Sequence, residues 1–153
     1  MFLKKKIDLF LNEAERKEIA DVIQLLEQNT SGEIRIAVDM HRNWFEKRKT
    51  LRTLALNEFH RLKMHKTRDK TGVLLYIQLD ERAFEIIADD GIYSKIGQEQ
   101  LNTIASALTS YFKQGKFKDG IVHVLQKAGE LLALHFPRRN NDTNELLNDI
   151  SFR

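Results

Sequence analysis

Cysteine is absent from the 153-residue sequence, which also contains only one proline and seven glycines. Without cysteine there is no disulfide, no thiolate zinc site and no cysteine nucleophile, so we expect any bound metal ion to be held by oxygen. The low proline and glycine content excludes collagen-like and linker-rich chains. No window approaches 18 uncharged apolar residues, and charges interrupt the apolar residues of the N-terminal segment. We therefore predict neither a signal peptide nor a membrane span, and we expect a cytoplasmic protein.

Several common catalytic motifs are also missing. The sequence contains no G-x-G-x-x-G, no P-loop and no G-x-S-x-G segment, so nucleotide binding through a glycine-rich loop and serine hydrolase chemistry have no support. His60 and His65 are five residues apart, which places them on different sides of a helix and excludes an i,i+4 metal pair.

The composition, 42% hydrophobic and 31% charged, is that of one globular domain. Hydrophobic periodicity predicts a mixed series of helices and strands. Asn12 and Glu15 have the spacing of a capping box at the start of the first predicted helix. The predicted elements are helix 12–28, strand 33–39, helix 43–64, strands 73–79 and 83–88, and helices 98–114 and 117–136.

This order predicts an α/β fold, a three-layer α/β/α sandwich with a small mixed sheet. The first two strands are joined by a helical crossover and should be parallel, and the third should return as an antiparallel hairpin. We expect a single domain over residues 1–137. A polar tail over residues 138–153 should pack on this domain or extend from it.

Charge is unevenly distributed along the chain. Residues 41–70 carry ten basic and three acidic side chains, a net charge of +7, whereas residues 80–90 carry a net charge of −4. One interpretation of the basic region 42–70 is a contact surface for an anionic protein or membrane, with Arg48 and Lys49 as anion contacts. A solvated helix face is the alternative. Only Trp44 and Phe45 accompany these charges, which argues against a nucleic-acid stacking platform.

Carboxylates lie at the ends of the predicted strands. Glu33 starts the first strand, and Asp89 and Asp90 follow the third, so the predicted topology places all three at one edge of the sheet. Their oxygens could bind a hard cation such as Ca²⁺ or Mg²⁺. The alternative is that Asp89, Asp90 and Gly91 form an ordinary turn, in which Gly91 is free to adopt a positive φ.

A series of short motifs, in this order and spacing, resembles the TPM-domain family. The resemblance extends over residues 12–152, and its tail is similar to that of stand-alone bacterial members. The segments that carry it are 29–35 (NTSGEIR), 64–67 with Asp69, 72–76, 80–84, 86–92, 112–117, 119–121, 135–137 and 144–152.

The resemblance implies an α/β/α sandwich, binding of Ca²⁺ or Mg²⁺, and a phosphatase activity of the kind proposed for thylakoid-lumen relatives. The metal role carries over best onto Asp89, with Asp90 and Glu33 beside it. In a metal-dependent phosphatase the ion would polarise the phosphoryl oxygen, and Arg35 could pair with the phosphate through two hydrogen bonds.

Overall fold

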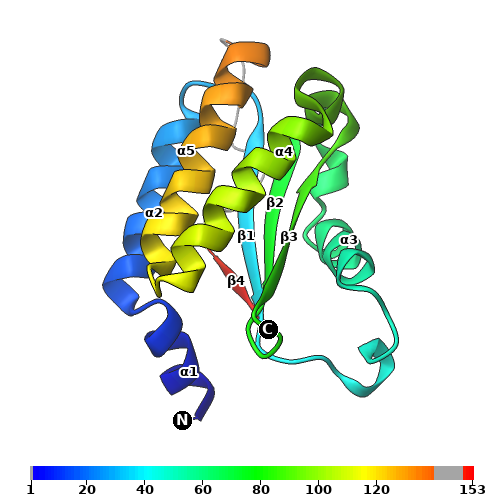
Figure 1. The fold of residues 1–153 in the computed structure, drawn as a ribbon. Coiled ribbons are helices and arrows are strands. Elements are labelled where there is room, and N and C mark those ends of the chain that lie inside the picture. Colours follow the sequence, from blue (N-terminus) through cyan, green and yellow to red (C-terminus); the bar gives the residue numbers. More distant parts are fainter. Residues whose placement is uncertain (1, 140–149) are drawn as a thin grey trace.

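The computed structural model describes residues 2–139 and 150–153 (Figure 1). A four-stranded mixed sheet in the order β3-β2-β1-β4 forms the central layer. Helices α2, α4 and α5 cover one face of this sheet and α3 covers the other, which gives the predicted three-layer α/β/α sandwich. The elements are α1 (Phe2–Phe10), α2 (Glu13–Glu27), β1 (Glu33–Asp39), the 3₁₀ turn η1 (Trp44–Glu46), α3 (Leu51–Arg61), the 3₁₀ turn η2 (Met64–Lys66), β2 (Gly72–Gln78), β3 (Ala83–Ala88), α4 (Asp90–Lys113), α5 (Phe117–His135) and β4 (Ser151–Phe152).

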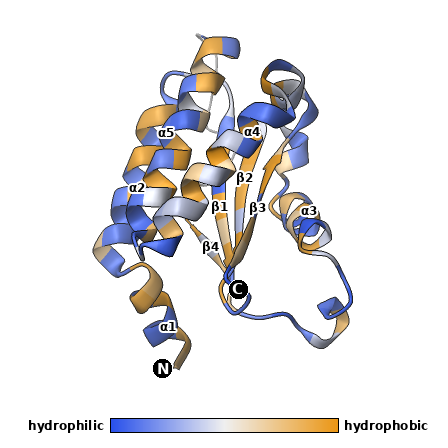
Figure 2. Cartoon of the chain, viewed as in Figure 1, coloured by the Kyte–Doolittle hydropathy of each residue, from blue (hydrophilic) through white to orange (hydrophobic). Residues whose placement is uncertain are grey.

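Strand pairing follows the predicted topology. β1 and β2 are parallel over their full length, and β2 and β3 form the antiparallel hairpin. All seven residues of β1 and all seven of β2 are buried, as expected for strands covered on both faces, and Figure 2 shows the centre of the sheet as hydrophobic. Alternate residues divide between two cores: Ile34 and Ile36 pack with the larger helical layer, whereas Ala37 packs with α3.

The predicted start of a helix agrees with the structure where the segment contains a single capping residue, as at α2. The capping box of Asn12 and Glu15 is present at the start of α2. The predicted helix 43–64 is wrong in its first part, because two caps compete there: Asn43 caps η1 and Thr50 caps α3, so the α-helix begins only at Leu51.

α4 also begins earlier than predicted, at Asp90, and a non-helical Gly97 (φ 74°) kinks it. The predicted positive φ at Gly91 is wrong, because only Gly97 and Gly115 among the glycines have one. Gly91 is needed for a different reason: a Cβ there would lie 2.0 Å from the carbonyl oxygen of Asp69 and 2.6 Å from that of Lys70. The glycine therefore permits the chain before β2 to pack against the first turn of α4.

Two elements were not predicted. α1 is fixed to the domain by Phe10, whose ring lies 5.1 Å from that of Phe117 and 6.2 Å from that of Phe112. β4 pairs in parallel with β1 at Ala37 and Val38 and extends the sheet on that side. The described end of the tail is thus part of the sheet.

Candidate functional site

The sheet brings the predicted acidic residues to one edge. Glu33 lies opposite Gly72 in the β1–β2 register, and the Asp89 backbone nitrogen donates to the Gly72 carbonyl oxygen (3.0 Å). Asp90 then begins α4. The start of β1, the start of β2 and the end of β3 therefore meet at this edge, as the predicted topology requires.

Asp89 is the N-cap of α4. Its Oδ1 accepts a hydrogen bond from the Asp90 backbone nitrogen (2.8 Å), an arrangement that the positive end of the helix dipole favours. Its Oδ2 is buried and has no hydrogen-bond partner among the described residues. The side chain of Asp90 is exposed. One carboxylate oxygen of the cap thus lacks a hydrogen-bond donor among the described residues.

The segment before β2 packs against this acidic loop. The Ile92 backbone nitrogen donates to the Lys70 carbonyl oxygen (3.3 Å), and Thr67 Oγ1 accepts from the Thr71 backbone nitrogen (3.1 Å). The carboxylate of Asp69 is engaged in an ion pair with Arg139 (3.0 Å). The contribution of this segment to the loop consists mainly of backbone carbonyls.

His65 lies within electrostatic reach of Asp89. Burial lowers the pKa of His65, and the charges of His60 and Lys66 lower it further, whereas Asp89 acts in the opposite direction. The His65 Nδ1 is buried and has no hydrogen-bond partner in the described ranges. A neutral imidazole is therefore favoured beside the acidic loop.

Glu33 and Arg35 of β1 are buried, and so is Glu27, which lies on the last turn of α2. Burial and the adjacent charge of Glu33 raise the pKa of Glu27 to about 9, and Arg35 partly offsets this. Glu27 Oε1 accepts a hydrogen bond from the Ile34 backbone nitrogen (3.1 Å). The two residues predicted to bind metal and phosphate thus have partners inside the protein.

Within residues 2–139 and 150–153, the structure contains no group of three or more histidine, aspartate or glutamate side chains that could hold a metal ion. Asp89 and Asp90 are adjacent, but Glu33 does not complete such a group with them. A cation at Asp89 would therefore take further ligands from backbone carbonyls and water.

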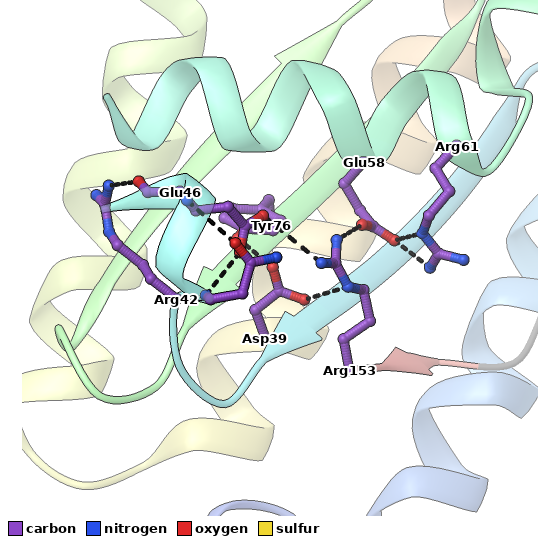
Figure 3. A network of polar contacts seen from close by, with 8 residues as sticks. Asp39, Arg42, Glu46, Glu58, Arg61, Tyr76 and Arg153 are labelled. Carbon is purple, nitrogen blue, oxygen red and sulfur yellow. Dashed lines mark hydrogen bonds and ion pairs between the residues drawn. The ribbon is translucent and has the colours of Figure 1, made fainter. Parts of the chain in front are cut away.

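A second polar cluster, beneath α3, was not predicted (Figure 3). The Tyr76 hydroxyl donates to Asp39 Oδ2, and the Arg153 guanidinium lies 3.6 Å from Asp39 Oδ1. Arg153 Nη1 also donates to Glu58 Oε2 (2.8 Å), and Arg61 Nε donates to Glu58 Oε1 (2.8 Å). Burial raises the pKa of Asp39, whereas the Tyr76 hydrogen bond and the Arg153 charge lower it. We call these residues the Arg153 network.

One signal in the sequence could have revealed this network. Glu58 is four residues after Leu54 and therefore lies on the apolar stripe of α3, where a charged residue needs a buried partner. Its side chain is fully buried. The partner, Arg153, is 95 residues away in the sequence, and no local pattern connects the two.

The predicted anion contacts Arg48 and Lys49 lie in the exposed segment between η1 and α3. Several other cations of the basic region are engaged in ion pairs, including Arg42 with Glu81 and Arg52 with Glu85. Arg48 and Lys49 have no ion-pair partner among the residues that the structure describes. They are consequently among the accessible cations of the basic region.

A comparison with family models matches residues 8–131 to the TPM domain. The chain belongs to the TPM-domain family. This TPM domain is similar to the BA42 protein of the psychrophilic bacterium Bizionia argentinensis, whose NMR structure superimposes with a TM-score of 0.82 at 37% identity, covering 92% of this chain and 93% of that one. The N-terminal domain of a P. gingivalis protein, also solved by NMR, has a TM-score of 0.61 at 15% identity, covers 86% of this chain and 83% of that one, and shows the fold alone. No curated protein matches the sequence.

The TPM domain also has an open groove of about 1230 Å³ along the edge of β3, between α1 and α4. Its lining includes Leu9 and Phe10 of α1, Phe84 and Ala88 of β3 and Leu101 of α4, and does not include Asp89 or Asp90. None of the helices in the described part of the chain combines the length and apolar character that crossing a membrane requires.

Proposed function

We propose that this TPM domain binds a divalent cation, Ca²⁺ or Mg²⁺, at the acidic loop formed by residues 89–91. The observation that carries the proposal is the buried Oδ2 of Asp89, which has no hydrogen-bond partner within the described residues. A buried carboxylate oxygen without a partner is unfavourable, and a hard cation would satisfy it.

Asp89 and the exposed Asp90 would supply carboxylate oxygens, whereas Glu33, the third residue predicted from the sequence, lies at the same edge of the sheet but has partners inside the protein. The carbonyl groups of Asp69 and Lys70 pack against Gly91 and offer neutral oxygens nearby. A bound ion would supply Lewis acidity toward a phosphoryl oxygen. Phosphomonoester hydrolysis is the activity that we propose for such a site.

Titration of the full chain with CaCl₂ and MgCl₂, followed by calorimetry and by amide NMR shifts of residues 88–92, tests the cation site. We expect Asp89→Asn to weaken binding by about tenfold or more, since ligand charge sets the affinity of such sites. Asparagine is an equally good helix cap, so this variant should remain folded. Asp21→Asn, on the exposed side of α2, is the matched control.

Unchanged shifts at residues 88–92 on addition of either ion would overturn the cation proposal. The hydrolytic part is tested separately with p-nitrophenyl phosphate. If Asp89→Asn hydrolyses it as fast as the unmodified chain, cation binding and hydrolysis do not share this residue, and the hydrolytic proposal is wrong.

A second candidate function is contact with an anionic protein or membrane surface through the basic region 42–70. It is favoured by the exposure of Arg48 and Lys49 beside two exposed aromatic rings, Trp44 and Phe45. We expect binding to immobilised polyglutamate or to anionic vesicles to decrease with added salt and to be lost in Arg48→Glu/Lys49→Glu. Lys17→Glu/Lys127→Glu, on α2 and α5, should bind as the unmodified chain does; equal loss in both double variants would contradict a localised contact.

A further inference from the structure

Two exposed elements flank the same hairpin turn, residues 80–82 between β2 and β3. On one side, Lys6 of α1 donates to Asp80 Oδ1 (3.2 Å). On the other side, Arg42, which precedes η1, pairs with Glu81. Figure 1 shows α1 and the η1 segment at the same end of the molecule, with the η1 segment projecting away from the sandwich. We call this end, made by α1, residues 41–50 and the hairpin turn, the basal end.

The basal end exposes large apolar side chains. Phe2 is 86% exposed, Trp44 75% and Phe45 81%. Leu3 and Leu9 on α1 are also exposed, so five of the nine large exposed hydrophobic residues in the described part of the chain lie at this end. The rings of Trp44 and Phe45 pack edge to face, with their centroids 5.7 Å apart. Such a concentration of exposed apolar groups marks an interaction surface.

The net charge of the basal end is positive, because it has eight basic and four acidic side chains. The acidic side chains are engaged in ion pairs: Asp8 with Arg16, Glu46 with Arg153, Asp80 with Lys6 and Glu81 with Arg42. Several cations at this end, by contrast, have no ion-pair partner within residues 2–139 and 150–153. They are Lys4, Lys5, Lys47, Arg48, Lys49 and Arg82.

We propose that the basal end docks on an anionic lipid bilayer, with Trp44 and Phe45 inserted at the headgroup level and α1 lying in the interface. This inference rests on the second proposed function and names its partner. Tryptophan favours the membrane–water interface, and basic side chains beside exposed apolar groups add electrostatic attraction to anionic lipids. A projecting tip suits a bilayer better than an acidic protein surface, because the apolar side chains at its end can enter the interface without a matching pocket.

Two separate elements of the basal end would enter the interface together. α1 has only nine residues, and the η1 segment has two aromatic side chains. Neither element has a large apolar surface alone. Their common attachment to the hairpin turn holds them at one end, so that the free energies of both insertions add.

The chain contains one tryptophan, Trp44, which makes its fluorescence a direct probe of the proposed contact. The purified chain is mixed with vesicles of phosphatidylcholine alone, or with about 30% phosphatidylglycerol to mimic an anionic leaflet. We expect a blue shift of Trp44 emission and co-sedimentation with the anionic vesicles only. Lipids brominated near the headgroup should quench Trp44, and added salt should release the protein.

Variants then separate the two elements. We expect Trp44→Ser/Phe45→Ser to weaken vesicle binding by about tenfold or more, and Phe2→Ser/Leu3→Ser to weaken it by a similar factor, because each removes two inserted side chains. Leu134→Ser, an equally exposed position (72%) on α5, should bind as the unmodified chain does. All substituted positions are exposed, and circular dichroism verifies that the variants remain folded.

Binding to anionic vesicles without a blue shift, or binding that survives Trp44→Ser/Phe45→Ser, would overturn the insertion proposal. Salt-dependent binding to polyglutamate without vesicle binding would also overturn it, while the second proposed function would stand with an acidic protein as partner. If neither polyglutamate nor vesicles bind, both proposals fail together.

Discussion

Carboxylates gather at both ends of the central sheet, but the two groups have opposite surroundings. At one end, Asp39 and Glu58 are buried and satisfied by Tyr76, Arg61 and Arg153. At the other, the cap Asp89 has a buried oxygen with no hydrogen-bond partner among the described residues. Charge alone does not distinguish a structural cluster from a ligand site. The presence or absence of internal partners does.

The largest effect is expected at Glu58, at the end of the sheet where the carboxylates have internal partners. We expect Glu58→Ala to lower the free energy of unfolding by about 3 kcal/mol, because it leaves buried partners of an ion-pair network without their anion. Urea denaturation measures the loss. Glu13→Ala on the exposed first turn of α2 should change stability by less than about 0.5 kcal/mol, and a similarly small loss in Glu58→Ala would mean that the Arg153 network contributes little.

Glu27 occupies a third kind of carboxylate environment, in which the side chain is buried and its raised pKa favours the protonated form. Its pKa is about 9 in the folded protein against an ordinary value of 4.5, so the folded state holds a proton that the unfolded chain releases. Stability from this group is present below pH 4.5 and is lost as pH rises toward 9. The slope should reach about 1.4 kcal/mol per pH unit within that window.

Urea denaturation at a series of pH values measures this slope. Glu27→Gln should remove it, since the amide remains neutral and can keep the hydrogen bond to the Ile34 backbone nitrogen. Glu13→Gln, an exposed position on the same helix, should leave the slope as it is. Identical pH profiles for Glu27→Gln and the unmodified chain would show that Glu27 is ionised in the folded protein.

The smallest effect is expected at the other end of the sheet, where Asp89 is the cap of α4 as well as a candidate ligand. Asp89→Ala should cost about 1 kcal/mol through the lost cap, whereas Asp89→Asn should cost only a few tenths. Thermal unfolding without divalent ions measures both. If Asp89→Asn loses as much stability as Asp89→Ala, the negative charge itself supports the fold, and loss of cation binding in that variant could not be attributed to ligation alone.

Much of the fold was predictable because its signals are local. The Asn12 capping box, the apolar strands and the β2–β3 hairpin each lie within a short window, and the parallel crossover follows from their order. The edge shared by Glu33, Asp89 and Asp90 was also predictable, since topology alone places these residues. The TPM-domain resemblance agreed with the same order of elements and is confirmed by the family match over residues 8–131.

The remaining features depend on contacts between distant segments. β4 is two residues long and pairs with residues more than 110 positions earlier. A segment this short has no hydrophobic periodicity from which a strand could be predicted. The electrostatic contact of Glu33 and Arg35 with Glu27 depends on α2 lying beside β1, which strand alternation does not reveal. The start of α3 was missed because the apolar stripe extends through a segment that Asn43 and Thr50 divide into two capped pieces.

The pairing of β4 with β1 has a consequence for the order of folding. During synthesis, β1, α3 and β2 are complete long before Ser151 and Phe152 emerge, and Asp39 and Glu58 must wait for the guanidinium of Arg153. Until then one edge of β1 has free backbone groups, and Asp39 and Glu58 beside it lack their shared guanidinium partner. Closing this long loop carries an entropic cost, so the nascent domain completes its sheet last at the strand that sequence periodicity could not identify.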